Sequence, residues 1–313
     1  MNSTDSTTEV GRWSDDVGIV VGLDDSPGSS KALFWAASRV ERFGKIQPVS
    51  TWHYPWWAVS PPAPGSPQPP AKDTFTAEVS ERVDRLLADI PAADRMEPII
   101  HRGSAGPTLV EVARAHKVLV VGTRGRGAIA DTLLGSVSLH CVSHADVPVI
   151  IVPPHVPIGD EAGRVVVGID GSDNSVAALA WALDNSPDTS MIEAVHAWSF
   201  PVDVLPEVTV AHTDKEEAAA TDRLKNAIEQ AAHQAGGSHR IEDVVATTTY
   251  GDPRSVLKET AAEADMLVLG ARGTGGISHL LLGSMTTAMC HQPTTTIAII
   301  PCSTKHMPSS ESD

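Results

Sequence analysis

The sequence has few cysteines and few basic residues. Its 313 residues include only 3 cysteines, an odd number without a Cys-x2-Cys pair. We therefore expect no disulfide framework, and we expect the protein to work in a reducing compartment. Only 23 Lys and Arg residues stand against 39 Asp and Glu, which gives a net charge of −16. General attraction to nucleic acids or anionic lipids is therefore not predicted, because such binding needs clustered positive charge.

Long apolar segments are also missing. No stretch approaches the ~20 apolar residues of a membrane-spanning helix, and residues 1–16 are polar and acidic, unlike a secretory signal. We therefore expect a cytoplasmic protein with no membrane or nucleic-acid partner. The length favours two domains, each large enough to bury a core without a metal or a disulfide.

What the sequence does contain is a glycine spacing that occurs twice, each time after an apolar run typical of a buried strand. The two copies are Gly122-x2-Gly125-x9-Gly135-Ser136 and Gly270-x2-Gly273-x9-Gly283-Ser284. α/β proteins bind phosphates where a strand opens into such a loop. Glycines bring backbone N–H groups close to an anion, and the two serines are expected at helix N-caps, with their hydroxyls facing a phosphate.

The repeat extends beyond the loops, which indicates a duplicated domain. Asp24 corresponds to Asp170, 146 positions later (170 − 24), and the loop glycines Gly122 and Gly270 are 148 positions apart (270 − 122). Strand-like and helix-like segments alternate in both halves. This alternation predicts an α/β fold with two tandem, doubly wound parallel-sheet domains.

Composition indicates where the domains begin and end. The predicted organisation is a disordered tail over 1–13, a domain over 14–153, a linker over 154–163, a domain over 164–302 and a disordered tail over 303–313. Residues 53–74, rich in proline and tryptophan, are expected to form a long loop, and residues 198–212 a shorter one before a helix over 216–235. Strands are expected over 96–101 and 241–247.

These features together resemble the ATP-binding branch of the universal stress proteins, in its tandem, two-domain bacterial form. The resemblance covers residues 17–153 and 164–302. Besides the aspartates and the glycine motif, it rests on the turns Gly103-Ser104-Ala105 and Gly251-Asp252-Pro253. It implies five strands per domain in the order 3-2-1-4-5, with the ligand where the strand order reverses.

The resemblance also implies one adenine nucleotide site per domain, holding ATP with Mg²⁺ on its phosphates. The aspartates would lie against the nucleotide, the residues closing strand two would contact adenine through the backbone, and the loop residues would hold ribose and phosphates. The candidate residues are Asp24, Thr51, Gly122, Arg124, Gly125, Gly135, Ser136 and Val137 in the first domain, and Asp170, Ala197, Gly270, Arg272, Gly273, Gly283, Ser284 and Met285 in the second. Strand five usually pairs with another strand five in this family, which implies a homodimer or an internal pseudo-dimer.

Each candidate also has a purely structural interpretation. The aspartates can be helix caps or turn formers, the glycines can simply end strands, the serines can cap helices without a ligand, and the arginines can pair with carboxylates. The tryptophans near the adenine side, Trp52 and Trp198 among them, favour packing over base stacking. His140 and His144 have metal-ligand spacing, but their counterparts in the second half are not ligands, so no metal site is predicted.

Binding is favoured over catalysis. The loops lack the Gly-Lys-[Ser/Thr] of a P-loop, and spacing alone reveals no catalytic grouping. We therefore expect a nucleotide-dependent stress-response or growth regulator whose nucleotide state is read by an unidentified protein partner. The alternatives are a slow ATP hydrolase and an interaction scaffold without nucleotide turnover, with the loop within 53–70 as its docking element.

Overall fold

The computed structural model describes residues 18–53, 72–91, 93–123, 125, 134–158, 163–199, 209–236, 241–274 and 282–301. The chain divides into two compact units near residues 147–155. Each unit is an α/β fold built on a sheet dominated by parallel strands, as the sequence predicts.

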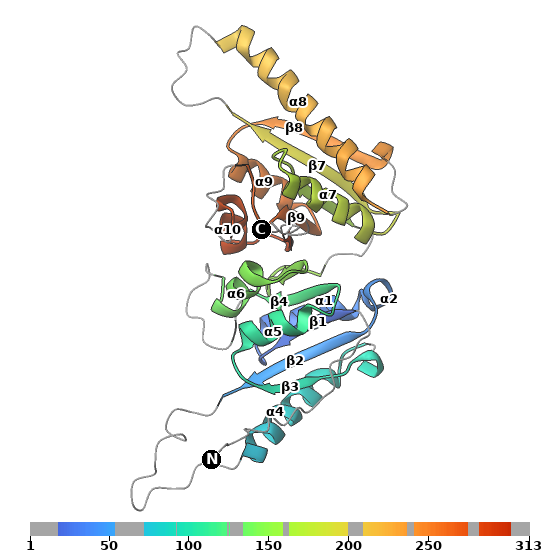
Figure 1. Cartoon of the computed structure of the whole chain (residues 1–313), viewed down its shortest axis with the longest axis vertical. Helices are drawn as coiled ribbons and strands as arrows, with labels where there is room; N and C mark the ends of the chain where they lie inside the picture. The colour runs from blue at the N-terminus through green and yellow to red at the C-terminus, as the bar shows by residue number, and fades with distance from the viewer. Residues whose placement is uncertain are drawn as a thin grey trace, which may run out of the picture. The chain divides into compact units, whose positions relative to one another are not determined.

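The first unit has the predicted strand order, β3-β2-β1-β4-β5, and Figure 1 labels the first four of these strands along the chain. Its strands are β1 (Ile19–Leu23), β2 (Ile46–Trp52), β3 (Ile99–Arg102), β4 (Val118–Gly122) and β5 (Val149–Val152). Its helices are α1 (Pro27–Ala37), α2 (Val40–Phe43), α4 (Lys72–Leu87), α5 (Ala105–Ala113) and α6 (Ser136–His144), with a 3-10 turn η1 (Ala93–Arg95). Ile19 of β1 lies between Ile46 and Val118, so the central strands run in register from their first residues.

The second unit repeats this arrangement in the order β8-β7-β6-β9-β10. Its strands are β6 (Arg164–Gly168), β7 (Met191–Trp198), β8 (Val244–Tyr250), β9 (Met266–Gly270) and β10 (Thr296–Ile300). Its helices are α7 (Asp173–Asn185), α8 (Thr209–Gln234), α9 (Pro253–Ala262) and α10 (Ser284–His291), with a 3-10 turn η3 (Ile241–Asp243). The central strands are almost wholly apolar because helices cover both of their faces, as parallel sheets require.

The strand order determines which helices share a face. The strands β7 and β8 are added in sequence on one side of β6. The chain then crosses back over the sheet, and β9 and β10 are added on the opposite side of β6. Right-handed crossovers therefore place α7 and α8 on one face and α9 and α10 on the other. The contacts agree, because α7 packs against α8 and α9 against α10. The order reverses beside β6, and correspondingly beside β1, so each unit has a crevice at the carboxyl ends of these strands.

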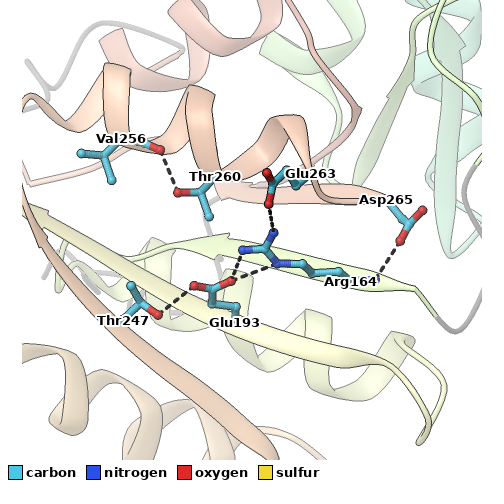
Figure 2. A network of polar contacts seen from close by, with 7 residues as sticks. All are labelled: Arg164, Glu193, Thr247, Val256, Thr260, Glu263 and Asp265. Atoms are coloured by element: carbon cyan, nitrogen blue, oxygen red, sulfur yellow. Dashed lines mark hydrogen bonds and ion pairs between the residues drawn. The ribbon is translucent and has the colours of Figure 1, made fainter.

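A polar network around the buried Glu193 lies toward the amino-terminal edge of the second sheet, and Figure 2 shows its residues. Glu193 is 7% exposed and accepts hydrogen bonds from Arg164 Nε (3.1 Å) and Nη2 (2.6 Å), and from Thr247 Oγ1 (2.7 Å). Arg164 also contacts the exposed Glu263 at 3.4 Å, and its backbone N–H donates to Asp265 Oδ2 at 2.8 Å. The network links β6, β7, β8 and the start of β9.

The cysteines in the described part of the chain are structural. Cys141 on α6 and Cys290 on α10 are both buried thiols. Burial disfavours the thiolate and raises the pKa of each to about 12. Neither thiol is therefore a nucleophile at neutral pH.

Several element boundaries differ from the sequence prediction. α4 begins at Lys72, within the segment 53–74 predicted as loop, and α8 begins at Thr209 instead of 216. In both helices the extra residues are mostly polar, so apolar periodicity does not reveal them. Residues 54–71 and 200–208, which make up most of the two predicted loops, lie outside the described residues.

Two predicted strands begin later than expected. Met96 makes only an isolated bridge with Ile46, and β3 starts at Ile99, because Pro98 has no N–H to donate to a ladder. Residues 241–243 form the turn η3 and β8 starts at Val244, since two consecutive acidic residues interrupt the strand-like alternation. Among the described residues, no helix is both long and apolar enough to cross a membrane.

Candidate functional site

In the second unit, Asp170 organises the turn between β6 and α7. Its Oδ1 accepts hydrogen bonds from the backbone N–H (3.0 Å) and the hydroxyl (2.6 Å) of Ser172. Ser172 is the N-cap of α7, and its Oγ accepts from Ser175 N at 3.2 Å. The aspartate is thus a turn former that positions the capping serine and is not itself the cap.

The first unit has the same arrangement. Asp24 Oδ1 accepts from Ser26 N (3.1 Å) and Ser26 Oγ (2.6 Å), and Ser26 caps α1 through Ser29 N (3.1 Å). The serines were not among the predicted site residues. A recognisable signal was present, because Asp-x-Ser-x2-Ser occurs after the first strand of both halves.

The second oxygen of each aspartate faces the glycine-rich loop. Asp170 Oδ2 accepts from Thr274 N at 2.7 Å. A Cβ built on Gly273 would collide with this same oxygen, and one built on Gly125 would collide with Asp24 Oδ2. The second glycine of each motif is therefore needed for the loop to approach the aspartate.

The hydrogen bonds also set the charge of Asp170. Burial by itself opposes the carboxylate, but the bonds from Ser172, Thr274 and Ser175 together outweigh it and lower the pKa of Asp170 below its ordinary value. Asp170 therefore carries a full negative charge at neutral pH. A negative charge facing the crevice is suited to accept a hydrogen bond from a ligand hydroxyl and is unsuited to contact a phosphate.

The first glycine of each motif allows a helix to pack closely on a strand end. A Cβ on Gly122 would lie 2.6 Å from the backbone carbon of Gly28 in α1, and one on Gly270 would lie 2.8 Å from the backbone of Asn174 in α7. These glycines do end β4 and β9. The close contacts that a side chain would make here are with the protein's own helices.

The end of each loop corrects a second expectation. The N-caps of α6 and α10 are Gly135 and Gly283, and Ser136 and Ser284 are the first helical residues, with no side-chain capping bond at either helix. The glycines adopt extended backbone angles that any residue can adopt, so the cap position here follows from the path of the loop and not from the preference of serine. The prediction that Ser136 and Ser284 are the N-caps of these helices is therefore wrong.

Hydroxyl groups further along these helices hold the two ends of each loop together. Ser138 Oγ donates to Gly122 O at 2.6 Å, and Thr286 Oγ1 donates to Gly270 O at 2.8 Å. Sequence analysis did not identify this pair, although Ser-x-[Ser/Thr] occurs at the start of both helices.

These elements surround a cavity of about 420 Å³ in the second unit. All the residues predicted for this half line it: Asp170, Ala197, Gly270, Arg272, Gly273, Gly283, Ser284 and Met285. Ala197, the last residue but one of β7, lies on one side, the loop and the N-terminus of α10 lie on the other, and Leu257 and Leu269 contribute apolar walls. The cavity therefore lies at the carboxyl ends of the strands where the order reverses.

The corresponding cavity of the first unit is smaller, about 140 Å³. Of the predicted residues, its lining includes Asp24, Thr51, Gly122, Gly125 and Val137. Gly135 and Ser136 are not part of its wall, and Arg124 lies outside the described residues. Arg82 of α4, which was not predicted, also lines this cavity.

Arg272 provides positive charge at the second cavity. Its Nε is buried and has no hydrogen-bond partner among the residues that the structure describes. A buried donor left without a partner is costly, so an oxygen-rich ligand in the cavity would satisfy a group that the protein leaves unsatisfied.

Other candidates from the sequence have structural roles. Trp52 stacks on Phe75 with ring centroids 5.7 Å apart, and Trp198 packs edge-on against Tyr250 at 5.1 Å, so both are engaged in packing. The imidazole rings of His140 and His144, one turn apart on α6, stack on each other with their centroids 4.2 Å apart. In the part of the chain that the structure describes, no three His, Cys, Asp or Glu side chains gather at a possible metal site.

Comparison with known proteins agrees with the duplication. The universal stress protein family matches the sequence twice, over residues 18–153 and 161–301. The chain belongs to this family. It is 32% identical over 288 residues to Universal stress protein Rv2623 of Mycobacterium tuberculosis, covering 86% of this chain and 91% of that protein. Universal stress protein Rv2005c of the same species is 30% identical over 298 residues, covering 88% and 93%.

Solved universal stress protein structures show the same fold over most of the chain. A universal stress protein from Archaeoglobus fulgidus superposes with a TM-score of 0.59 at 19% identity, covering 90% of this chain and 97% of that one. One from Pseudomonas aeruginosa gives 0.58 at 10% identity, covering 92% and 94%. This chain is therefore a tandem universal stress protein.

Proposed function

We propose that each half of this universal stress protein binds ATP with Mg²⁺, and that nucleotide occupancy regulates a stress or growth response through a protein partner. The observation that carries the proposal is the second cavity. Eight residues selected from the sequence as nucleotide contacts all line one cavity at the switch point of a doubly wound sheet. Its volume of about 420 Å³ falls within the range of small-molecule sites.

The residues of the second cavity suit the parts of a nucleotide in different places. Ala197 of β7, Leu257 of α9 and Leu269 of β9 supply the apolar part of the cavity lining, which suits a base. The charged Asp170 suits a ribose hydroxyl. The unpartnered Nε of Arg272 and the exposed N–H groups at the start of α10 suit phosphate oxygens, since a helix N-terminus favours an anion.

Such local attraction is needed because the protein as a whole is acidic. With a net charge of −16, the chain repels a triphosphate at long range. Mg²⁺ would reduce this repulsion, and we propose that it is held by phosphate oxygens and water, which are the ligands it prefers. The residues that would hold the phosphates are Arg272 with Gly273, Gly283 and Ser284 in the second half.

The direct test is mass spectrometry of the small molecules released when the purified protein is denatured. We expect adenine nucleotide, and a rise in the melting temperature when MgATP is added to stripped protein, because a ligand that binds only the folded state stabilises it. A stripped protein whose melting temperature does not respond to MgATP, together with no retained nucleotide, contradicts the proposal and favours a scaffold. Multiple turnovers of released phosphate per site would instead make the protein an ATP hydrolase.

A further inference from the structure

Two arginines occupy equivalent positions on the long helices of the two halves. Arg82 on α4 directly precedes the buried Val83, and Arg223 on α8 directly precedes the buried Leu224. Each helix packs on the second strand of its own sheet. The arginines nevertheless differ in one respect, because Arg82 lines the first cavity and Arg223 does not line the second.

A histidine holds Arg223 in the second half. His196, on β7, is 5% exposed, and its Nδ1 lies 2.7 Å from Ile169 O. A carbonyl oxygen can only accept, so Nδ1 carries the proton and Nε2 is the acceptor. Arg223 Nη1 donates to that Nε2 at 3.2 Å.

A glycine provides the path for the Arg223 side chain. Gly171 has a φ of +82°, and a Cβ built on it would lie 2.9 Å from both Cγ and Cδ of Arg223. The aliphatic part of Arg223 therefore passes directly over the turn, in space that only glycine leaves open.

The equivalent positions of the first half carry neither this glycine nor this histidine. Asp25 replaces the glycine and has a φ of +67°, so its Cβ occupies the space over the turn. The buried Ser50 stands where His196 stands in β7 and is too short to provide the same acceptor. Arg82 consequently cannot follow the path of Arg223, and it lies along the cavity, whose volume is about 140 Å³ against about 420 Å³.

We propose that His196 is a positioning residue that holds Arg223 out of the second cavity, so that the second half is the high-affinity nucleotide site and Arg82 restricts the first. This inference rests on the proposed nucleotide binding and adds to it a difference between the two sites. When a side chain occupies a site for most of the time, the apparent affinity falls by the fraction of time for which the site is open. Releasing Arg223 is therefore expected to weaken the second site without changing any residue that touches the ligand.

The test is photolabelling of the full chain with 8-azido-ATP in competition with MgATP, followed by quantification of the labelled peptides from each half. We expect His196→Ser to weaken MgATP binding to the second half by about tenfold, as it would if Arg223 closed the site about nine-tenths of the time. Arg223→Ala alone, and His196→Ser combined with Arg223→Ala, are expected to bind within about threefold of the wild type. His196→Gln keeps a hydrogen-bond acceptor for Arg223, so its second half is also expected to bind MgATP within about threefold of the wild type.

The first half gives the converse result. Arg82→Ala is expected to tighten its binding by about tenfold, whereas Arg85→Ala, which removes an exposed arginine from the same helix, leaves it unchanged. The proposal is overturned if the double variant at 196 and 223 remains as weak as His196→Ser, since His196 would then act through the backbone at Ile169. It is also overturned if Arg82→Ala weakens the first site, since Arg82 would then be a ligand contact.

A crystal structure of the His196→Ser variant distinguishes this proposal from the proposed function. We expect the Arg223 guanidinium to enter the second cavity, whether or not the protein binds nucleotide. An Arg223 that keeps its position over Gly171 without the imidazole contradicts the inference. Failure of the wild-type protein to bind MgATP contradicts the proposed function alone.

Discussion

Replacement of Asp170 by alanine tests how the crevice of the second half is built. The carboxylate accepts two bonds from Ser172 and one from Thr274, and it connects the end of β6 with the loop after β9. Hydrogen bonds to a charged group contribute about 1.5–3 kcal/mol each when buried. Because this site is half-buried and water can replace part of what is lost, we expect Asp170→Ala to destabilise the second unit by about 2 kcal/mol in total.

Hydrogen exchange measured by mass spectrometry is the suitable assay, because its peptides report on each unit separately. We expect faster exchange in β6, α7 and β9, and unchanged exchange in the first unit, which serves as the internal control. We also expect the variant to lose MgATP binding in the second half only. A loss of stability below about 0.5 kcal/mol, or one shared equally by both units, would refute the role assigned to Asp170.

The pH dependence of this difference provides a second check. The folded pKa of Asp170 is lowered from its ordinary value, which is ~3.9 in the unfolded chain. The carboxylate therefore contributes its full stabilisation above about pH 4 and loses it as the pH falls through the lower folded pKa. When wild type and Asp170→Ala are compared at the same pH, the difference should be constant near neutrality and should narrow below about pH 4.

Three further predictions concern other parts of the fold. Gly122→Val is expected to destabilise the first unit by about 3 kcal/mol in urea unfolding, because the new Cβ would collide with the α1 backbone. Gly283→Ala is the control: its Cβ would lie 3.3 Å from the nearest atom, Arg272 Cα, and we expect a cost below about 1 kcal/mol. Glu193→Ala leaves the largely buried Arg164 guanidinium without its main partner and is expected to lower the stability of the second unit by about 3 kcal/mol. Replacing the exposed Glu263 by alanine is expected to cost only about 0–1 kcal/mol, and equal effects of the two substitutions on hydrogen exchange would contradict this prediction. The two buried thiols should resist iodoacetamide at pH 8 until the protein unfolds, as peptide mapping can show.

The sequence was sufficient to predict the fold because its signals agreed at several levels. Apolar runs before the glycine motifs predicted β4 and β9, and the duplicated spacing indicated a second unit built like the first. The predicted boundaries were wrong at the starts of α4, α8, β3 and β8. α4 and α8 begin with polar turns that carry no apolar periodicity, and Pro98 delays β3 although its neighbours are strand-like.

The site was predicted less completely because its polar contacts depend on tertiary structure. Gly122 and Gly125 were selected for backbone freedom, yet what requires glycine there is the approach of α1 and of Asp24. Neither approach can be read from a single segment. Arg82 and His196 carry no local motif, and their relation to the cavities follows only from the packing of α4 and α8 on the sheets.

The distribution of polar groups in the second unit separates stability from ligand binding. The network of Arg164 and Glu193 lies toward the amino-terminal edge of the sheet, and Asp170 with its loop lies at the carboxyl ends of the strands. Parallel strands place their C-terminal ends on a single edge, so substitutions near the start of β6 and β7 can change unfolding without touching the cavity. The same two edges exist in the first unit, but there Gln47 replaces Glu193 and its buried Oε1 has no hydrogen-bond partner within the described ranges. With glutamine at this position the first sheet does not repeat the contact of Arg164 with Glu193 there, and a difference in stability between the units would say nothing about which of them binds nucleotide.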